Sequence, residues 1–215
     1  MKKRLVIAGA GDFGREVVEW VKTSPVFLKN SEINEIVFID DDNSRADAST
    51  IPLVGGISSY TPEVNDIFLC SVGNPATRER ICSSLASRGA TFATFVHDTA
   101  LIGDRVTLGR GTIVCPAVIM STDIVVAEQV HINVACTVGH DAQVGSYATL
   151  SSSCNLAGHV SLGSGVFLGT AVTIIPGKRV GFNSRVGAGS VVLRSLSGNV
   201  SAFGNPCRPI GKIES

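Results

Sequence analysis

A repeat of six residues begins at Ile102, and it restricts the possible folds more than any other feature of the sequence. The first position of fifteen successive hexads is aliphatic, and the run contains no insertion. These residues are Ile102, Leu108, Val114, Met120, Val126, Ile132, Val138, Val144, Leu150, Leu156, Leu162, Leu168, Ile174, Val180 and Val186. The second position is mostly small, with glycine in eight hexads, and the fifth is small or β-branched except at Lys178. A period of six fits neither an α-helix nor a meander of hairpins.

The repeat is instead typical of a short strand, a tight corner and another short strand. Three such segments form one coil, and successive coils stack at about the 4.8 Å spacing of paired strands. The aliphatic side chains point inward, and glycine relieves the crowded backbone at the corners. Residues 102–191 therefore predict a parallel β-helix of five coils, in which residues 18 apart lie above one another.

Residues 1–96 have a different pattern, in which apolar runs alternate with helical stretches. The expected strands are 4–8, 35–39, 67–72 and 91–96, and the expected helices are 15–21 and 76–87. This alternation is typical of a parallel α/β sheet. We therefore divide the chain into an α/β domain at 1–96 and a β-helix domain, with a short C-terminal extension, at 97–215.

The first expected strand ends in a glycine-rich loop that matches G-x-G-x-x-G at Gly9, Gly11 and Gly14. Such a loop allows close backbone approach and presents the N-terminus of the next helix to an anion. The second strand ends at Asp40, whose carboxylate can accept hydrogen bonds from a ribose or a base. Because the carboxyl ends of parallel strands converge, these residues predict a nucleotide site. The domain is half the size of a dinucleotide fold, which favours a ligand of mononucleotide size over NAD.

A second interpretation of the glycine loop is that it only packs a helix onto a strand. Asp12 lies inside the loop, where its carboxylate would repel a pyrophosphate. The sequence leaves both interpretations open.

Composition excludes several classes of protein. The formal net charge is zero, which argues weakly against nucleic acid as a partner. No apolar run approaches the roughly 20 residues of a membrane span, and no signal peptide is visible. The six cysteines lack zinc-ligand or redox spacing, so we expect reduced thiols in a cytoplasmic protein without a bound metal. Cys136 and Cys154 should stack as small core residues, although their expected spacing would permit a disulfide.

Residues 142–213 contain six bases and no acid. The bases are Lys178, Arg179, Arg185, Arg194, Arg208 and Lys212. A segment that keeps positive charge and excludes negative charge suits a polyanionic small ligand. A solvated basic tail is the alternative.

His140 is the best-placed candidate for catalysis. It follows a corner glycine and precedes Asp141, whose carboxylate could hold one ring nitrogen and raise the basicity of the other. Gly158 lies 18 residues further on, so it should stack over His140 and leave room for an acyl group beside an exposed N–H. The same spacing places His159 over Asp141. The alternative is a histidine that is merely exposed at a corner.

The order of motifs along the chain resembles a known family. A glycine-rich loop, an acidic strand end and Gly73–Asn74 are followed by coils that contain VGHDAQVG at 138–145, VGAGSVV at 186–192 and GNPCRP at 204–209. This order is similar to that of the hexapeptide-repeat sugar O- and N-acyltransferases, which include sialic acid O-acetyltransferases and UDP-4-amino-sugar acetyltransferases. The resemblance implies a Rossmann-like half domain that binds a sugar nucleotide, a left-handed β-helix, and acetyl-CoA as the acyl donor.

The resemblance also implies roles for individual residues. His140 would be the general base, Asp141 its orienting acid, Asn133 a neighbour of the acceptor sugar, and Gly158 a backbone donor to the thioester carbonyl. Acetyl-CoA would lie in a groove between two subunits of a homotrimer, where the matching positions are Gly158, Thr170, Ala188, Thr149 and Lys178. The sugar nucleotide would contact Gly9, Gly11, Phe13, Gly14, Asp40, Asp41 and Asn74.

Three residues depart from the family pattern. Thr149 occupies a position where relatives often have a second histidine, and Asp12 and Phe13 stand where relatives often have Gly and His. These changes leave the identity of the acceptor open more than that of the donor.

The sequence as a whole predicts an acetyltransferase that N-acetylates a nucleotide-linked amino sugar by direct transfer, and the resemblance implies a role in polysaccharide biosynthesis. Three alternatives remain. The enzyme could O-acetylate a sugar hydroxyl such as that of a sialic acid, the β-helix could be a binding module without catalysis, or the glycine loop could serve a redox enzyme that uses NAD.

Overall fold

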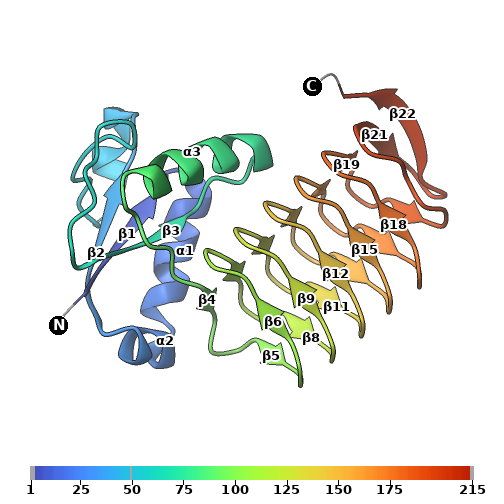
Figure 1. The fold of residues 1–215 in the computed structure, drawn as a ribbon, viewed down its shortest axis with the longest axis horizontal. Helices are drawn as coiled ribbons and strands as arrows, with labels where there is room; N and C mark the ends of the chain where they lie inside the picture. Colours follow the sequence, from blue (N-terminus) through green and yellow to red (C-terminus); the bar gives the residue numbers. More distant parts are fainter. Residues whose placement is uncertain (1–2, 49, 214–215) are drawn as a thin grey trace. The chain divides into compact units, whose positions relative to one another are not determined.

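The computed structural model describes residues 3–48 and 50–213. The chain forms two compact units, Met1–Asp98 and Thr99–Ser215. Figure 1 shows that the helices belong to the first unit and that the second consists of stacked coils. Within the described residues, no helix has the length and apolar character needed to cross a membrane.

The first unit is built on a parallel sheet in the order β2-β1-β3, which confirms the predicted α/β class. The strands are β1 (Lys3–Ala8), β2 (Ile33–Ile39) and β3 (Asp66–Cys70), followed by the short β4 (Phe95–Val96). The helices are α1 (Asp12–Lys22), α2 (Pro25–Asn30), α3 (Pro75–Ser87) and the 3₁₀ helix η1 (Asn43–Ala48). The last four residues of β1 are fully buried, as the central strand of a parallel sheet requires.

Some predicted boundaries of this unit differ from the structure. The strand expected at 91–96 is reduced to β4, and only Phe92 bridges to the sheet, through Phe68. The first helix begins at Asp12 rather than at Arg15. Neither α2 nor η1 was expected, because six residues are too few to show a helical period.

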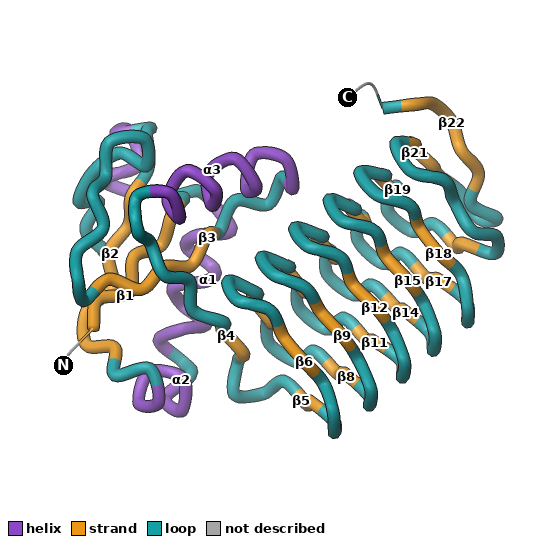
Figure 2. The backbone as a smooth tube through the Cα atoms, in the orientation of Figure 1, coloured by secondary structure: helices purple, strands orange, loops and turns teal. Residues whose placement is uncertain are grey.

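The second unit is a triangular coil with three parallel faces (Figure 2). The β11 face contains β5 (Leu101–Ile102), β8 (Ile119–Met120), β11 (Thr137–Val138), β14 (Asn155–Leu156), β17 (Thr173–Ile174) and β20 (Val191–Val192). The β12 face contains β6 (Thr107–Leu108), β9 (Val125–Val126), β12 (Gln143–Val144), β15 (Ser161–Leu162) and β18 (Arg179–Val180). The β13 face contains β7 (Ile113–Val114), β10 (His131–Ile132), β13 (Thr149–Leu150), β16 (Phe167–Leu168), β19 (Arg185–Val186), β21 (Val200–Phe203) and β22 (Arg208–Lys212).

The register between coils is 18 residues on every face. Thr137 pairs with Asn155 on the β11 face, and Gln143 pairs with Ser161 on the β12 face. Val138, at a first hexad position, is 2% exposed, in agreement with the predicted inward ladder. Stacking continues past the predicted five coils, because β21 pairs in parallel with β19 before β22 turns back antiparallel.

Glycine has a different role in the corners from the one we expected. The left-handed backbone conformation falls at the fourth hexad position, where Asp123, Asp141 and His159 each have φ of 58°. The second-position glycines serve close packing between coils instead, because a Cβ atom on Gly103 would collide with the carbonyl oxygen of Ser121. Sequence inspection missed the fourth position because most of its residues are not glycine.

All six cysteines are free and buried. The thiol of Cys136 donates to the Ser151 carbonyl oxygen at 3.1 Å, and that of Cys154 to the Gly169 carbonyl oxygen at 3.2 Å. The pair therefore consists of reduced core residues, as predicted.

Candidate active site

His140 and Asp141 occupy one corner of the β-helix, between β11 and β12. His140 Nδ1 lies 2.7 Å from Asp141 Oδ2. An ionised carboxylate only accepts hydrogen bonds, so Nδ1 carries the proton and donates it to Asp141. The lone pair of the neutral imidazole is therefore on Nε2, which leaves this nitrogen able to accept a proton.

Gly158 lies in the next coil, directly against the His140 ring. The backbone of the two coils is joined by a 2.8 Å hydrogen bond from the His159 amide to the His140 carbonyl oxygen. A Cβ atom at position 158 would lie 2.6 Å from both Cε1 and Nε2 of His140. Among the described residues, none accepts a hydrogen bond from the Gly158 amide. The corner thus places a basic nitrogen and an unoccupied N–H donor side by side.

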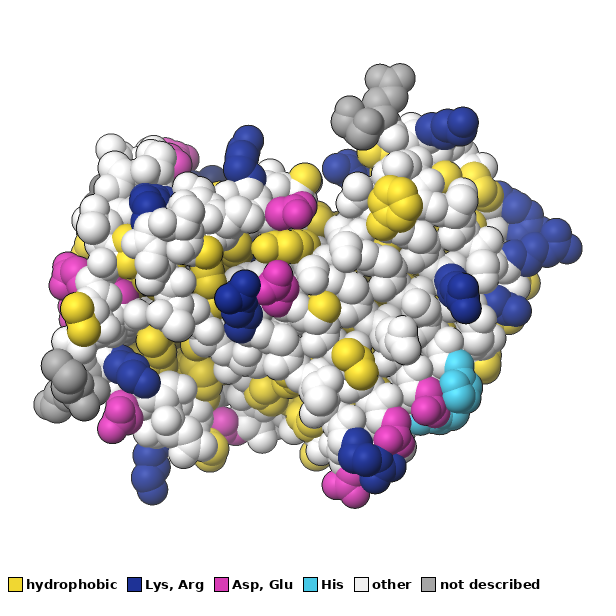
Figure 3. Space-filling model, in the orientation of Figure 1, with side chains coloured by type: hydrophobic (Ala, Val, Ile, Leu, Met, Phe, Trp, Pro, Cys, Tyr) yellow, Lys and Arg dark blue, Asp and Glu magenta, His cyan; other side chains and the backbone are white. Residues whose placement is uncertain are grey.

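His159 is a further member of this corner. Its Nε2 lies 3.8 Å from Asp141 Oδ2, and its ring meets that of His140 edge-on with centroids 5.0 Å apart. The three side chains each offer a ligand atom within 4.8 Å of the others, so they could hold a metal ion. All three are exposed, and Figure 3 shows histidine atoms beside acidic atoms at this edge.

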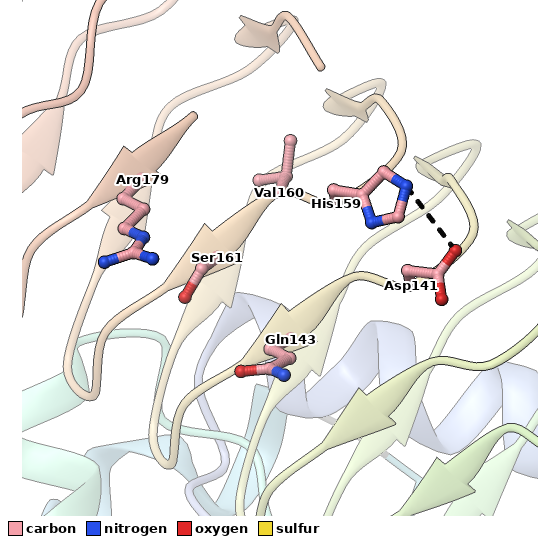
Figure 4. Close-up of a pocket in the computed structure, with 6 residues that line it drawn as sticks. All are labelled: Asp141, Gln143, His159, Val160, Ser161 and Arg179. Atoms are coloured by element: carbon pink, nitrogen blue, oxygen red, sulfur yellow. Dashed lines mark ion pairs between the residues drawn. The ribbon is translucent and has the colours of Figure 1, made fainter. Parts of the chain in front are cut away.

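A groove of about 440 Å³ begins at this corner. It is lined by Asp141, Gln143, His159, Val160, Ser161 and Arg179. Figure 4 shows that Gln143, Ser161 and Arg179 project from successive strands of the β12 face, with Arg179 at the far end from His159. The groove therefore offers amide, hydroxyl and guanidinium donors in a row. Sequence inspection did not single out Gln143 or Ser161, although the 18-residue register would have placed them together.

The other predicted donor-site residues are distributed over different parts of the coil. Asn133, Thr170 and Ala188 follow strands of the β13 face, so they lie on a different edge from His140 within one chain. Thr149 lies in β13 and is 3% exposed. Lys178 directly precedes β18, on the His140 edge. Within one chain, the structure therefore joins His140 and Asp141 to Gly158, but not to Asn133, Thr170 or Ala188.

A separate pocket of about 300 Å³ lies in the α/β unit, at the carboxyl ends of its strands. It is lined by Gly9, Gly11, Asp12, Phe13, Asp40, Arg45, Ser71, Val72 and Gly73. Gly9 has φ of +107°, and a Cβ atom on Gly14 would collide with the Gly9 carbonyl oxygen. The glycine loop therefore does pack α1 closely onto β1, and it also lines a pocket.

The predicted acceptor-site residues have different roles in this region. Asp40 faces the pocket, and its carboxylate accepts from the amides of Ala10 at 2.7 Å and Asp42 at 2.9 Å. Asp41 accepts from the amide and hydroxyl of Ser58, and it does not line the pocket. Asn74 caps α3 by accepting from the Thr77 amide at 3.0 Å. The structure thus brings Gly9, Gly11, Phe13 and Asp40 together, with Gly14 beneath the loop.

Arginines missed by sequence inspection shape this pocket. Arg78 is fully buried and donates to the carbonyl oxygens of Val72 at 2.8 Å and Gly73 at 3.1 Å. Arg45 pairs with Asp42 at 3.1 Å, and hydrogen bonds from Ser44 and then Arg45 hold the pKa of Asp42 below its ordinary value. No sequence motif marks either arginine, because both act through contacts that depend on the fold.

Comparison with known proteins identifies both units. Residues 4–85 match the family model of the PglD N-terminal domain. The GDP-perosamine N-acetyltransferase of Escherichia coli O157:H7 is 25% identical over 140 residues, which is 65% of this chain and 63% of that relative. The matched part is thus less than two thirds of the relative's length.

Solved structures cover nearly the whole chain. The acetyltransferase domain of PglB from Neisseria gonorrhoeae FA1090, in complex with acetyl coenzyme A, has a TM-score of 0.87 at 25% identity and covers 98% of this chain and 100% of its own. PerB from Caulobacter crescentus, in complex with CoA and GDP-perosamine, has a TM-score of 0.84 at 27% identity and covers 96% of this chain and 97% of its own.

The motif order, the α/β unit and the coil all agree with these relatives. The chain therefore belongs to the sugar acyltransferases of the hexapeptide-repeat type.

Proposed function

We propose that this protein transfers the acetyl group of acetyl-CoA to the amino group of a nucleotide-linked amino sugar. The observation that carries the proposal is the His140 corner, where Nδ1 is held by Asp141 and Nε2 lies against the Gly158 backbone. Relatives in complex with acetyl-CoA, or with CoA and a GDP-linked sugar, support both substrates.

The reaction is a direct transfer. His140 Nε2 takes a proton from the acceptor amine as the amine nitrogen attacks the thioester carbonyl. The new N–C bond forms, the C–S bond breaks, and the CoA thiolate leaves and takes the proton from the imidazolium. Asp141 stabilises the imidazolium, and the Gly158 amide donates to the carbonyl oxygen as negative charge develops there. Cys136 and Cys154 are buried and take no part.

The acceptor is bound through its nucleotide in the pocket of the α/β unit. Asp40, Phe13 and the glycine loop line this pocket, and the PglD N-terminal domain match covers the same segment. A sugar hydroxyl is the second candidate acceptor, because the carboxylate of Asp12 lines the same pocket and opposes a phosphate.

The donor is held by the basic segment of the coil. Arg179 lies in the groove beside His159, and Lys178 precedes it on the same edge. These cations suit the phosphates of CoA. Thr170 and Ala188 lie on another edge, so we propose that they contact the CoA bound at the His140 corner of a second copy, in a homotrimer.

An acetyl-transfer assay tests the reaction. The protein is incubated with acetyl-CoA and 4-amino sugars linked to UDP, GDP or dTDP, and thiol release and product mass are measured. We expect an N-acetylated product in one nucleotide series. An O-acetylated product, or transfer to free sugars only, would support the second acceptor. Absence of transfer to every acceptor would remove the catalytic assignment and leave a binding module.

A complementation experiment tests the shared site. His140→Ala removes the base and Ala188→Trp fills the proposed CoA edge, so each variant alone should be inactive. In a mixed assembly purified through two different tags, one site combines an intact His140 with an intact Ala188. We expect this assembly to recover activity, and an inactive mixed assembly would contradict the shared site.

Two further aspects are proposals that follow from the function. The resemblance places the reaction in polysaccharide biosynthesis. The six reduced cysteines fit the cytoplasm, where thiols stay reduced.

A further inference from the structure

We propose that Arg45 binds the diphosphate of the sugar nucleotide, and that it does so by exchanging its contact with Asp42 for the phosphates. This inference rests on the proposed function, in which the acceptor carries a nucleotide. It assigns a role to a residue that neither the glycine motif nor the acidic strand end includes.

The position of Arg45 is the first argument. Arg45 lies in η1, and its guanidinium reaches back over the glycine loop. A Cβ atom at Gly11 would lie 2.5 Å from Arg45 Nη1, so the guanidinium lies directly against the backbone of the loop. The same loop leads into the first turn of α1, whose N-terminal amides favour an anion. A diphosphate at this turn would therefore lie beside Arg45.

The hydrogen bonding of Arg45 is the second argument. Its Nε lies 3.1 Å from Asp42 Oδ2 and 3.8 Å from Asp40 Oδ2. Within the described parts of the chain, neither terminal nitrogen of Arg45 donates a hydrogen bond to another residue. Two nitrogens of the planar guanidinium thus remain available for a bidentate contact with phosphate oxygens. The Asp42 side chain is 51% exposed, and an exposed ion pair is weak enough to be exchanged.

The charge of the pocket is the third argument. Its described lining contains two acids, Asp12 and Asp40, and a single base, Arg45. Asp12 is paired with Arg15 at 2.6 Å on the solvent side, which reduces its effect on the pocket. Without Arg45, a diphosphate would face two carboxylates and no cation in the lining. Arg45 therefore offsets the repulsion from Asp12 that argued against a pyrophosphate in the sequence.

The contact predicts a specific pattern of affinities. Arg45 should distinguish a nucleoside diphosphate from the nucleoside alone and leave recognition of the base unchanged. A hydrogen bond to a charged group accounts for about 10- to 100-fold in affinity.

Calorimetric titration tests this pattern with GDP, UDP and dTDP and with the matching nucleosides. The variants are Arg45→Gln, Arg45→Lys and Arg80→Gln, the last being a control at an exposed arginine of α3 outside the pocket. For the preferred base, we expect Arg45→Gln to weaken diphosphate binding about 10- to 100-fold and to leave nucleoside binding unchanged. Arg45→Lys should lose less, and Arg80→Gln should match the wild type. Thermal unfolding of each variant verifies that the fold is intact.

Two outcomes would overturn the inference, and they can be told apart. Diphosphate binding to Arg45→Gln at wild-type affinity would remove the role of Arg45 and leave the proposed function intact. Failure of the wild-type protein to bind any of the three diphosphates would remove the nucleotide acceptor itself. In the favourable case, Asp12→Asn should also tighten diphosphate binding, because it removes a negative charge from the pocket.

Discussion

In the β-helix, the position of a side chain follows from its place in the hexad, whereas in the α/β unit it follows from bonds between arginines and the backbone. His140 and Gly158 lie together because they are 18 residues apart in a coil with that register. In the α/β unit, Arg78 holds the Val72 and Gly73 carbonyl groups, and Arg88 donates to the carbonyl oxygens of Tyr60 and Ile57.

This difference separates two requirements of the enzyme. A repeated coil can hold a base and an amide donor in fixed register, which transition-state stabilisation requires. Loops held by individual side chains can differ between relatives without change to the sheet, which suits recognition of different acceptors. The β-helix is thus the part that we expect to do the chemistry, and the α/β unit the part that selects the acceptor.

The largest effect is expected at Gly158. In Gly158→Ala the new Cβ would lie 2.6 Å from Cε1 and Nε2 of His140, so the ring must turn away. The ring is a flexible side chain, so stability should change little, but kcat should fall about 100- to 1000-fold. Steady-state kinetics and thermal unfolding measure the two effects. Gly211→Ala is the control, since a Cβ there meets no atom within 4 Å. Wild-type kcat in Gly158→Ala would show that the register does not control the base.

The next effect concerns the buried charges of the α/β unit. Arg4 donates to Asp66 at 2.8 Å, and the Asp66 side chain is 1% exposed. Burial alone would raise the pKa of Asp66, but hydrogen bonds from Arg4, the Glu63 amide and Tyr60 outweigh it and lower the pKa. Arg4→Leu leaves this carboxylate unpaired, so it should destabilise the unit by about 3 kcal/mol.

Urea denaturation measures this loss through the fluorescence of Trp20, the single tryptophan, which lies in α1. The matched control is Arg105→Leu in the β-helix, because Arg105 pairs with Asp123 on the surface. The control should leave stability unchanged. Equal losses in both variants would mean that the two units do not differ in this respect.

A smaller effect is expected at Asp141. Asp141→Asn keeps the size of the side chain but removes the charge that orients and stabilises the His140 imidazolium. The value of kcat should fall about 10- to 100-fold, while KM for acetyl-CoA should change little. Asp123→Asn, one coil away, serves as the control in the same kinetic assay. A change confined to KM would assign Asp141 to binding.

The smallest effect is a pH dependence at His97. Burial lowers the pKa of His97 below its ordinary 6.5, and its Nε2 lies 3.3 Å from the Thr23 hydroxyl. The unfolded chain therefore binds the proton more tightly. The contribution of His97 to stability is complete above pH 6.5 and is lost as pH falls through the lower pKa of the folded state. Denaturation followed by Trp20 at pH 7.5 and 5.5 should show a loss that His97→Gln reduces. An identical loss in this variant would assign the pH dependence to another group.

The comparison also explains how much could be predicted from the sequence. The coil, its register and the His140, Asp141 and Gly158 corner followed from the six-residue period, since stacking turns sequence distance into spatial distance. The pairing of Arg45 with the glycine loop did not, because the long side chain crosses some 30 residues of sequence without any periodic mark. The corner conformations were also missed, since Asp141 and His159 adopt a positive φ usually taken by glycine.

The most direct test of the account is the rate of a single acetyl transfer in His140→Ala with both substrates saturating. Single-turnover conditions separate the chemical step from binding and product release. Loss of a general base should slow this step about 100- to 10,000-fold, while acetyl-CoA still binds with the affinity of the wild type. A rate within a few-fold of the wild type would contradict the account, because the corner that the repeat assembles would not be the group that moves the proton.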